Sequence, residues 1–366
     1  MISFLDLKLI NTPFFDKLEE ASTRTIRNGW YLLGNELKNF EEAFARYCDA
    51  KYCVGVANGL DAITLILKSF ELPAKSEIIV PANTYIATVL PVSALGYTPV
   101  LVEPDPATML LDPDLIEQHI TVRTKAIITT DLYGRSCAID RVLAIADQYG
   151  LKVVTDAAQA HGATYQGRKV GSWAHATAFS FYPTKNLGAL GDAGAVVTSD
   201  AELADKIRFL RNYGSLVRYQ NEYKGVNSRM DELQAAFLNI KLPYLDRDNQ
   251  RRKTIARKYL QEIKLPQLIL PANDQINEDV WHLFVVKHPQ RDRLKAYLFE
   301  NGIQADIHYP TPIHKQKAYK QFNHLPLPIT EKLCQEVLSL PLHPMLTDDE
   351  IDYIVETVNK FNSTYL

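Results

Sequence analysis

The chain has 366 residues, of which 46% are apolar and 23% are charged, and its net charge is −3. This composition fits a soluble globular protein with one large and one smaller domain, and the charge gives no sign of a nucleic-acid partner. The N-terminus lacks a signal-peptide pattern and no apolar run reaches membrane-spanning length, so we expect a cytoplasmic location. The four cysteines show no metal-binding or Cys-x-x-Cys spacing, so we expect reduced thiols and no metal site.

An amphipathic helix is predicted at Phe14–Asn28, ahead of a regular alternation of strand and helix patterns. Short Val- and Ile-rich runs predict seven strands, at Tyr52–Val56, Glu77–Pro81, Pro99–Glu103, Lys125–Thr130, Lys152–Asp156, Thr177–Phe181 and Gly194–Thr198. Helical patterns between them cover Leu60–Phe70, Tyr85–Ala94, Pro113–Ile120, Ile139–Tyr149 and Ala201–Tyr213. This alternation predicts an α/β fold with a seven-stranded, mostly parallel sheet covered by helices on both faces.

After residue 232 a long helical pattern begins, which Pro243 should interrupt before it continues to about Ile263. The remaining chain mixes a short strand at Trp281–Val286, a helix at Arg291–Asn301 and an irregular Pro- and His-rich segment at His308–His314. We therefore expect a large domain over residues 1–250, including the N-terminal helix, and a smaller C-terminal α+β domain over residues 251–366.

The most informative stretch surrounds Lys185, which follows the predicted strand Thr177–Phe181 and is separated from it by Pro183. A lysine in a loop beyond a strand end can be desolvated, lose its proton and form a Schiff base with a carbonyl. Asp156 also ends a predicted strand, and its carboxylate could keep a pyridine nitrogen protonated. Taken singly, Lys185 could be a solvated loop lysine and Asp156 a helix N-cap.

A third feature, Asn58-Gly59, lies upstream of Asp156 and Lys185. A strand runs into this pair and a helix begins there, so free backbone N–H groups could bind a phosphate, although Asn-Gly is also an ordinary turn. The three features occur in the order phosphate turn, acid, lysine, each at the end of a different strand. A Schiff-base lysine with an acidic partner for a pyridinium nitrogen is what pyridoxal 5'-phosphate (PLP) requires.

Six motifs extend this pattern over most of the chain. They are Gly29-Trp30-Tyr31-Leu32-Leu33-Gly34, Asn58-Gly59-Leu60-Asp61-Ala62, Asp156-Ala157-Ala158-Gln159-Ala160-His161-Gly162, the Lys185 loop, Asn227-Ser228-Arg229-Met230-Asp231-Glu232 and His308-Tyr309-Pro310-Thr311-Pro312-Ile313-His314. With them the sequence resembles the DegT/DnrJ/EryC1/StrS sugar-nucleotide aminotransferases, which have the PLP-dependent transferase type I fold.

The resemblance implies that Lys185 carries the cofactor and that Asp156 pairs with the pyridinium nitrogen. Gln159, one helical turn beyond Asp156, would pack on one face of the cofactor ring, and Tyr85 would stack on the other. From the pattern alone, Gln159 could instead cap a helix and Tyr85 could be a core residue.

The resemblance also assigns the phosphate and the subunit arrangement. Gly59, Leu60 and Ser180 would hold the phosphate, and Asn227 would reach the phosphate of a neighbouring subunit in a homodimer with shared active sites. Many family members have Ser-Gly-Thr where this chain has Asn58-Gly59-Leu60, so Leu60 has only its backbone to offer.

The substrate residues implied are Tyr182, Arg229, His308, Tyr309 and His314. The last three would bind the sugar nucleotide, as residues of the neighbouring subunit, although a histidine flanking prolines fits a plain turn equally well. Arg229 is a candidate carboxylate anchor or a surface residue at a helix start. Trp281-His282 is expected in the core of the small domain.

The expected reaction is amination at C3 of a dTDP-3-keto-6-deoxyhexose with L-glutamate as amino donor, giving the dTDP-3-amino-3,6-dideoxyhexose. The Asn-Gly-Leu-Asp-Ala form and the Tyr182-Pro183-Thr184 sequence before Lys185 resemble the C3-aminating branch of the family. Two alternatives remain open at this point: the same chemistry at C4 of a 4-keto sugar, and a non-catalytic binding or regulatory protein on the same fold.

Overall fold

The computed structural model describes residues 1–215, 217 and 219–362. Its centre is a seven-stranded sheet in the order β1-β9-β8-β5-β4-β2-β3. The strands are β1 (Tyr52–Val56), β2 (Glu77–Pro81), β3 (Thr98–Val102), β4 (Thr124–Thr130), β5 (Lys152–Asp156), β8 (Ala176–Ser180) and β9 (Gly194–Thr198). All seven were predicted from the sequence, each within one residue at either end, because buried Val- and Ile-rich runs in a parallel sheet give a strong signal.

Strand direction in this sheet decides where the site forms. The pairs among β8, β5, β4, β2 and β3 are parallel, and β9 runs antiparallel to both of its neighbours, β1 and β8. Gly194, at the start of β9, pairs with Val56 on one side and with Ser180 on the other. The carboxyl ends of β1, β5 and β8 therefore meet at one edge of the sheet, where open α/β sheets bind ligands.

Helices cover both faces, because alternate strand residues point in opposite directions. Ile78 and Val80 of β2 pack in one core with α4, α5 and α7, whereas Ile79 packs in a second core with α6. The helices around the sheet are α2 (Phe15–Asn28), α3 (Asn35–Tyr47), α4 (Gly59–Ser69), α5 (Ile86–Ala94), α6 (Ile139–Tyr149), α7 (Ala201–Leu210) and α8 (Glu232–Lys241). A short helix, α1 (Leu7–Asn11), and a small hairpin, β6 (Thr164–Tyr165) with β7 (Arg168–Lys169), complete this part.

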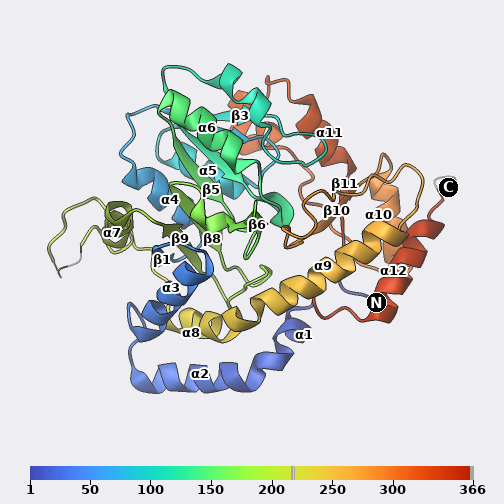
Figure 1. The fold of residues 1–366 in the computed structure, drawn as a ribbon, viewed down its shortest axis with the longest axis horizontal. Helices are drawn as coiled ribbons and strands as arrows, with labels where there is room; N and C mark the ends of the chain where they lie inside the picture. Colours follow the sequence, from blue (N-terminus) through green and yellow to red (C-terminus); the bar gives the residue numbers. More distant parts are fainter. Residues whose placement is uncertain (216, 218, 363–366) are drawn as a thin grey trace.

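Pro243 interrupts the long helical pattern as expected, within a 3-10 turn at Leu242–Tyr244. Helix α9 (Leu245–Glu262) then runs from the end of α8, beneath the sheet, to the C-terminal part of the molecule (Figure 1). Its residue Leu245 packs in the core of the large sheet, and Tyr259 packs in the C-terminal core. That core contains the two-stranded sheet β10 (Phe284–Lys287) and β11 (Val337–Leu340) with α10 (Arg291–Glu300), α11 (Pro328–Glu336) and α12 (Asp348–Lys360).

Some predictions about elements were wrong or incomplete. The segment predicted as a helix at Pro113–Ile120 forms two 3-10 turns, because its hydrogen bonds join residues three apart, such as His119 N–H to Ile116 O at 3.0 Å. Helix α7 ends at Leu210 instead of Tyr213, and α3 was not predicted. Over the part of the chain described here, no helix is both long and apolar enough to span a bilayer.

Candidate active site

A cavity of about 580 Å³ opens at the edge of the sheet where β1, β5 and β8 end. Its size is typical of a small-molecule site. Ten of the site residues predicted from the sequence line it: Gly59, Leu60, Tyr85, Asp156, Gln159, Ser180, Tyr182, Lys185, His308 and Tyr309. The other three, Asn227, Arg229 and His314, lie outside it. The fold thus gathers residues from five separate stretches of the sequence around one space.

Asp156 ends β5 with its carboxylate buried and fixed in orientation. Thr88 Oγ1 donates to Oδ2 at 2.7 Å and the Ala158 N–H donates to Oδ1 at 3.1 Å. Burial raises the pKa of Asp156, while these two hydrogen bonds and the charge of Lys185 act in the opposite direction. A buried carboxylate with this support is suited to hold a cationic nitrogen placed in the cavity.

Lys185 lies in the loop between β8 and β9, on the wall of the same cavity. The loop is closed by backbone hydrogen bonds from Lys185 N–H to Tyr182 O and from Ala189 N–H to Phe181 O, both 2.8 Å long. Burial lowers the pKa of Lys185 to about 8, and the charge of Asp156 opposes this effect. The neutral, nucleophilic form of the amine is therefore far more populated near neutral pH than in an ordinary lysine.

The first turn of α4 meets Ser180 at the end of β8, because β9 draws β1 and β8 together at Gly194. A Cβ on Gly59 would come within 2.7 Å of the Ser180 Cβ, and one on Gly194 within 2.4 Å of the Asn58 carbonyl carbon. Asn58 caps the helix by accepting the Asp61 N–H at 2.8 Å. The amides of Gly59 and Leu60 precede the first intrahelical bonds, so they remain available to an anion beside the Ser180 hydroxyl.

Gln159 and two tyrosines form another wall. The Gln159 side chain accepts the Tyr133 N–H at 2.6 Å and donates to Tyr309 Oη at 3.1 Å. The ring of Tyr309 lies 5.0 Å from that of Tyr85, which is 51% exposed and so is not a core residue. The expected helical turn between Asp156 and Gln159 is wrong, because the chain after β5 forms turns, and these bring Gln159 to the cavity instead.

The histidines of the segment 308–314 were expected together in the site of a neighbouring subunit, and this expectation needs two corrections. His308 and Tyr309 line the cavity of their own chain. His308 is held by a 2.9 Å hydrogen bond between Nδ1 and Ser339 Oγ and stacks on Phe4. His314 is fully buried and bonds through Nε2 to Glu331 Oε1 at 2.9 Å, so it supports the local fold and cannot touch a substrate.

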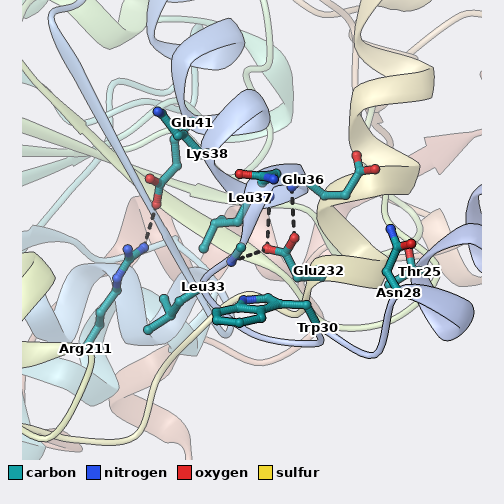
Figure 2. Close-up of a pocket in the computed structure, with 12 residues that line it drawn as sticks. Thr25, Asn28, Trp30, Leu33, Glu36, Leu37, Lys38, Glu41, Arg211 and Glu232 are labelled. Atoms are coloured by element: carbon teal, nitrogen blue, oxygen red, sulfur yellow. Dashed lines mark hydrogen bonds and ion pairs between the residues drawn. The ribbon is translucent and has the colours of Figure 1, made fainter. Parts of the chain in front are cut away.

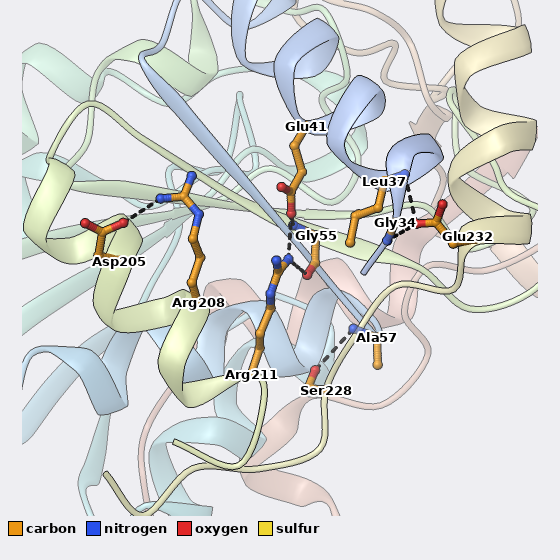
Figure 3. A network of polar contacts seen from close by, with 10 residues as sticks. All are labelled: Gly34, Leu37, Glu41, Gly55, Ala57, Asp205, Arg208, Arg211, Ser228 and Glu232. Carbon is orange, nitrogen blue, oxygen red and sulfur yellow. Dashed lines mark hydrogen bonds and ion pairs between the residues drawn. The ribbon is translucent and has the colours of Figure 1, made fainter. Parts of the chain in front are cut away.

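Asn227 and Arg229 precede α8, on a segment that is tied to the large sheet. Asn227 is exposed, and Arg229 Nη1 donates to Asn212 Oδ1 at 2.9 Å. Between them, Ser228 Oγ accepts the Ala57 N–H at 3.1 Å (Figure 3). The segment is therefore fixed next to the start of α4, while its exposed side chain lies outside the cavity.

A second cavity, of about 490 Å³, lies beside this segment and below the start of α3. Glu232 points at that helix start and accepts the N–H groups of Gly34, Glu36 and Leu37, at 2.8 to 3.1 Å (Figure 2). Arg211 donates to Glu41 and to the Gly55 carbonyl, at 2.6 Å each (Figure 3). Glu232, Arg211 and Glu41 thus already have partners within the chain, and we assign them to the fold.

Sequence reasoning missed two residues of interest, one that holds Asp156 from behind and one that lines the Lys185 cavity. Thr88 holds Asp156 but is one of several small residues in the apolar pattern of α5, which carries no signal for that role. His282, expected in the small-domain core, lines the cavity instead. Its contact with the site depends on the packing of the C-terminal part against the large sheet, which no local pattern reveals.

A family model for the DegT/DnrJ/EryC1/StrS aminotransferase family matches residues 16–359. The chain belongs to this family. A relative from Aneurinibacillus thermoaerophilus, a dTDP-3-amino-3,6-dideoxy-alpha-D-galactopyranose transaminase, is 54% identical, with 99% of each chain covered. The crystal structure of DesV from S. venezuelae, in complex with a ketimine intermediate, superposes with a TM-score of 0.95 at 45% identity, covering 98% of this chain and 97% of that one.

The cofactor of this family is PLP, and a further solved structure, NtdA from Bacillus subtilis with bound PMP, has a TM-score of 0.92 at 34% identity over 97% of this chain and 83% of the other. The residues present here fit PLP. The close approach of Gly59 to Ser180 leaves an anion cradle without side chains in it, and Asp156 offers a buried carboxylate. Lys185 supplies an amine of lowered pKa on the same cavity.

Proposed function

We propose that this aminotransferase converts a dTDP-3-keto-6-deoxyhexose to the dTDP-3-amino-3,6-dideoxyhexose, with L-glutamate as amino donor. The observation that carries the chemistry is one cavity that brings together Asp156, Lys185 and the amide cradle of Gly59. The choice of sugar is supported by the relative that is 54% identical over the full length, which is a dTDP-3-amino-3,6-dideoxy-alpha-D-galactopyranose transaminase.

Bound PLP would supply an electron sink for the carbon that loses its proton. Lys185 would hold the cofactor through Nζ and, once the amino donor has taken its place, move a proton from the donor's α-carbon. Asp156 would keep a proton on the ring nitrogen, for which Thr88 and Ala158 orient the carboxylate. Gly59, Leu60 and Ser180 would bind the phosphate, with backbone amides and one hydroxyl.

The ring of the cofactor would lie between Gln159 and Tyr85. The amide of Gln159 is held on both sides, by Tyr133 and by Tyr309, so its plane cannot rotate freely. Tyr182, His308 and Tyr309 line the remaining wall and are our candidates for placing the hexose. A site that hydrogen-bonds a hydroxyl rejects a misplaced one strongly, so these side chains would determine which carbon is aminated.

Product analysis tests the substrate. The purified enzyme, loaded with PLP, is incubated with L-glutamate and either a 3-keto or a 4-keto dTDP-6-deoxyhexose, and the products are identified by NMR. We expect faster conversion of the 3-keto sugar. Faster conversion of the 4-keto sugar would overturn the C3 assignment but leave the aminotransferase chemistry intact. Absence of any absorbance band from bound PLP near 400–420 nm would favour the non-catalytic alternative.

We propose in addition that the enzyme is a homodimer in which Asn227 and Arg229 serve the partner's site. Both lie outside the cavity of their own chain. Trp30, Tyr31 and Tyr213, at 65%, 57% and 51% exposure, offer an apolar surface that a second copy could cover. A C2 dimer would repeat the exchange twice. The cytoplasm is the proposed location, supported by four cysteines that are buried and free.

Mixing two inactive variants tests the shared sites. Lys185→Ala lacks the amine in one chain and Asn227→Ala lacks the proposed phosphate contact from the other. A hybrid dimer regains one site with both wild-type residues, so we expect partial recovery of activity after subunit exchange. Activity that does not return after confirmed exchange, or a fully active monomer in sedimentation, would contradict the proposal.

We also propose the division into domains at residues 1–250 and 251–366. The boundary falls inside α9, whose first turns pack on the large sheet and whose last turns pack on β10 and β11. The first residues depart from a simple division, because Ile2 pairs with Ile303 and Phe4 stacks on His308.

A further inference from the structure

His282 is a buried histidine of the active-site cavity for which the proposed reaction has no role so far. It lines the same cavity as Lys185 and is 8% exposed. Its Nδ1 lies 3.0 Å from Oδ1 of Asn186, the residue that follows Lys185 in the chain. The inference below rests on the proposed function, because it concerns how the amine of Lys185 is oriented.

A chain of amides behind Lys185 fixes the proton of His282. Asn249 donates through Nδ2 to the His161 carbonyl at 2.9 Å. Its Oδ1 therefore faces Asn186, whose Nδ2 donates to it at 2.9 Å and to the Val280 carbonyl at 3.1 Å. The two backbone carbonyls can only accept, so they set the orientation of both side-chain amides without ambiguity.

Because both donors of Asn186 face acceptors, its Oδ1 must accept, and the atom facing it must donate. That atom is Nδ1 of His282, so the proton of the neutral imidazole is on Nδ1 and the lone pair is on Nε2. Burial lowers the pKa of His282 well below its usual value, and the charge of Lys185 contributes in the same direction. The ring is therefore neutral at physiological pH and lies within electrostatic reach of the lysine.

We propose that His282 is a positioning residue for Lys185: its Nε2 accepts a hydrogen bond from Nζ when the freed lysine carries a proton. The amide chain Asn249–Asn186 holds the imidazole in the tautomer that makes this possible. A ring that resists protonation cannot take the proton away, so it orients the ammonium and leaves proton transfer to Lys185 itself.

This arrangement gives the two sides of the lysine different functions. Asp156 attracts the ammonium by charge, whereas His282 offers one directional lone pair without a charge. A lysine ammonium is a compact charge on a flexible stem, and charge alone leaves its direction open. A neutral acceptor restricts that direction at little cost to the amine's ability to lose its proton.

Two variants separate the ring nitrogens of His282. His282→Asn places an amide where Nδ1 stands, keeping a donor to Asn186 and removing the acceptor in the cavity. His282→Gln places an amide where Nε2 stands and retains an acceptor. We expect His282→Asn to slow single-turnover conversion of the bound cofactor by L-glutamate about 10- to 100-fold, the effect of losing a hydrogen bond to a charged group.

In the same assay His282→Gln should stay within about fivefold of wild type, and KM for glutamate should change by less than about threefold in both variants. Equal loss in the two variants, or His282→Asn within about threefold of wild type, would overturn the role. This assay contains no sugar. A wild-type enzyme that fails to react with glutamate therefore counts against the proposed function and not against His282.

The tautomer is tested independently of the cofactor and of turnover. Long-range ¹H–¹⁵N correlation spectra of the cofactor-free protein distinguish a protonated from an unprotonated ring nitrogen, and His282→Asn identifies the signal among the nine histidines. We expect a neutral ring with the proton on Nδ1 from pH 6 to 8, and a mixture of tautomers in Asn249→Ala. A proton on Nε2, or a charged ring at pH 7, would overturn the proposal.

Discussion

Two aspartates lie at the ends of neighbouring parallel strands, yet their surroundings favour opposite protonation states. Asp156 ends β5, and Asp131 follows β4, with its N–H bonded to the Asp156 carbonyl at 3.0 Å. Both are buried. Asp156 accepts hydrogen bonds on both oxygens and faces Lys185, whereas Asp131 accepts one, from the Cys137 N–H, and its Oδ2 has no partner among the described residues.

This difference appears in their protonation. Burial raises the pKa of Asp131 to about 8, and the charges of Asp156 and Asp279 add to the effect. Burial also raises the pKa of Asp156, but two donors and a nearby cation counter it. Asp131 is therefore protonated at neutral pH, and Asp156 is the one prepared to carry charge. A strand-end position brings an acid to the site, and its donors decide whether it ionises.

Removing the cation that Asp156 faces should have the largest effect. Lys185→Ala eliminates both the attachment point of the cofactor and the group that moves the proton, so we expect turnover to fall at least about 1,000-fold. The measurement is steady-state formation of aminosugar from glutamate and the keto-sugar nucleotide. Near-normal turnover in this variant would refute the assignment of Lys185.

Neutralising Asp156 should have the second largest effect on the rate. Asp156→Asn keeps the shape but can no longer hold a proton on the ring nitrogen by charge, and the cost of a few kcal/mol corresponds to about 100-fold or more in rate. The matched control is Asp131→Asn, which we expect to stay within about threefold of wild type at pH 7, because Asp131 is already neutral there. Similar losses of rate in the two variants would contradict the different roles assigned to Asp156 and Asp131.

Removing one of the two hydrogen bonds that Asp156 accepts should make its carboxylate harder to ionise, as that of Asp131 already is. Thr88→Val is isosteric and deletes the hydroxyl that donates to Oδ2 at 2.7 Å. We expect about a 10-fold loss in kcat/KM, the effect of one hydrogen bond to a charged group. Thr84→Val removes the next hydroxyl, 2.8 Å from that of Thr88, and should cost less. An unchanged rate in Thr88→Val would show that Asp156 does not need this donor.

The smallest expected effect concerns stability. The pKa of Asp131 is about 4 in the unfolded chain and about 8 in the folded protein. Between these two pH values the unfolded chain loses the proton first, so the free energy of unfolding falls as the pH rises. Asp131→Asn removes this loss, so its stability relative to wild type should increase by about 1 kcal/mol between pH 5 and pH 6. Urea unfolding at the two pH values measures it; a constant difference would contradict the raised pKa of Asp131.

The sequence predicted the sheet and the centre of the site for the same reason. Parallel strands are buried on both faces, and their carboxyl ends converge, so Asp156, Lys185 and Gly59 could be placed at one edge from their positions alone. Thr88 and His282 could not be found this way, because packing between elements brings Thr88 to the Asp156 carboxylate and His282 to the cavity. His314 misled for the opposite reason, since its motif resembled a binding segment while its ring is fully buried.

The way the Lys185 loop is built affects which substitutions the protein can tolerate during evolution. Ser180 and Gly194 pair directly, so the sheet closes the loop at both ends. Within it, Phe181 and Leu187 belong to the buried core, while Tyr182 and Lys185 face the cavity. Mutations of Tyr182 or Lys185 change the wall of the cavity without removing apolar side chains from the buried core, so they can alter the chemistry while the core stays intact. New reactions can therefore arise on this scaffold through changes at very few positions.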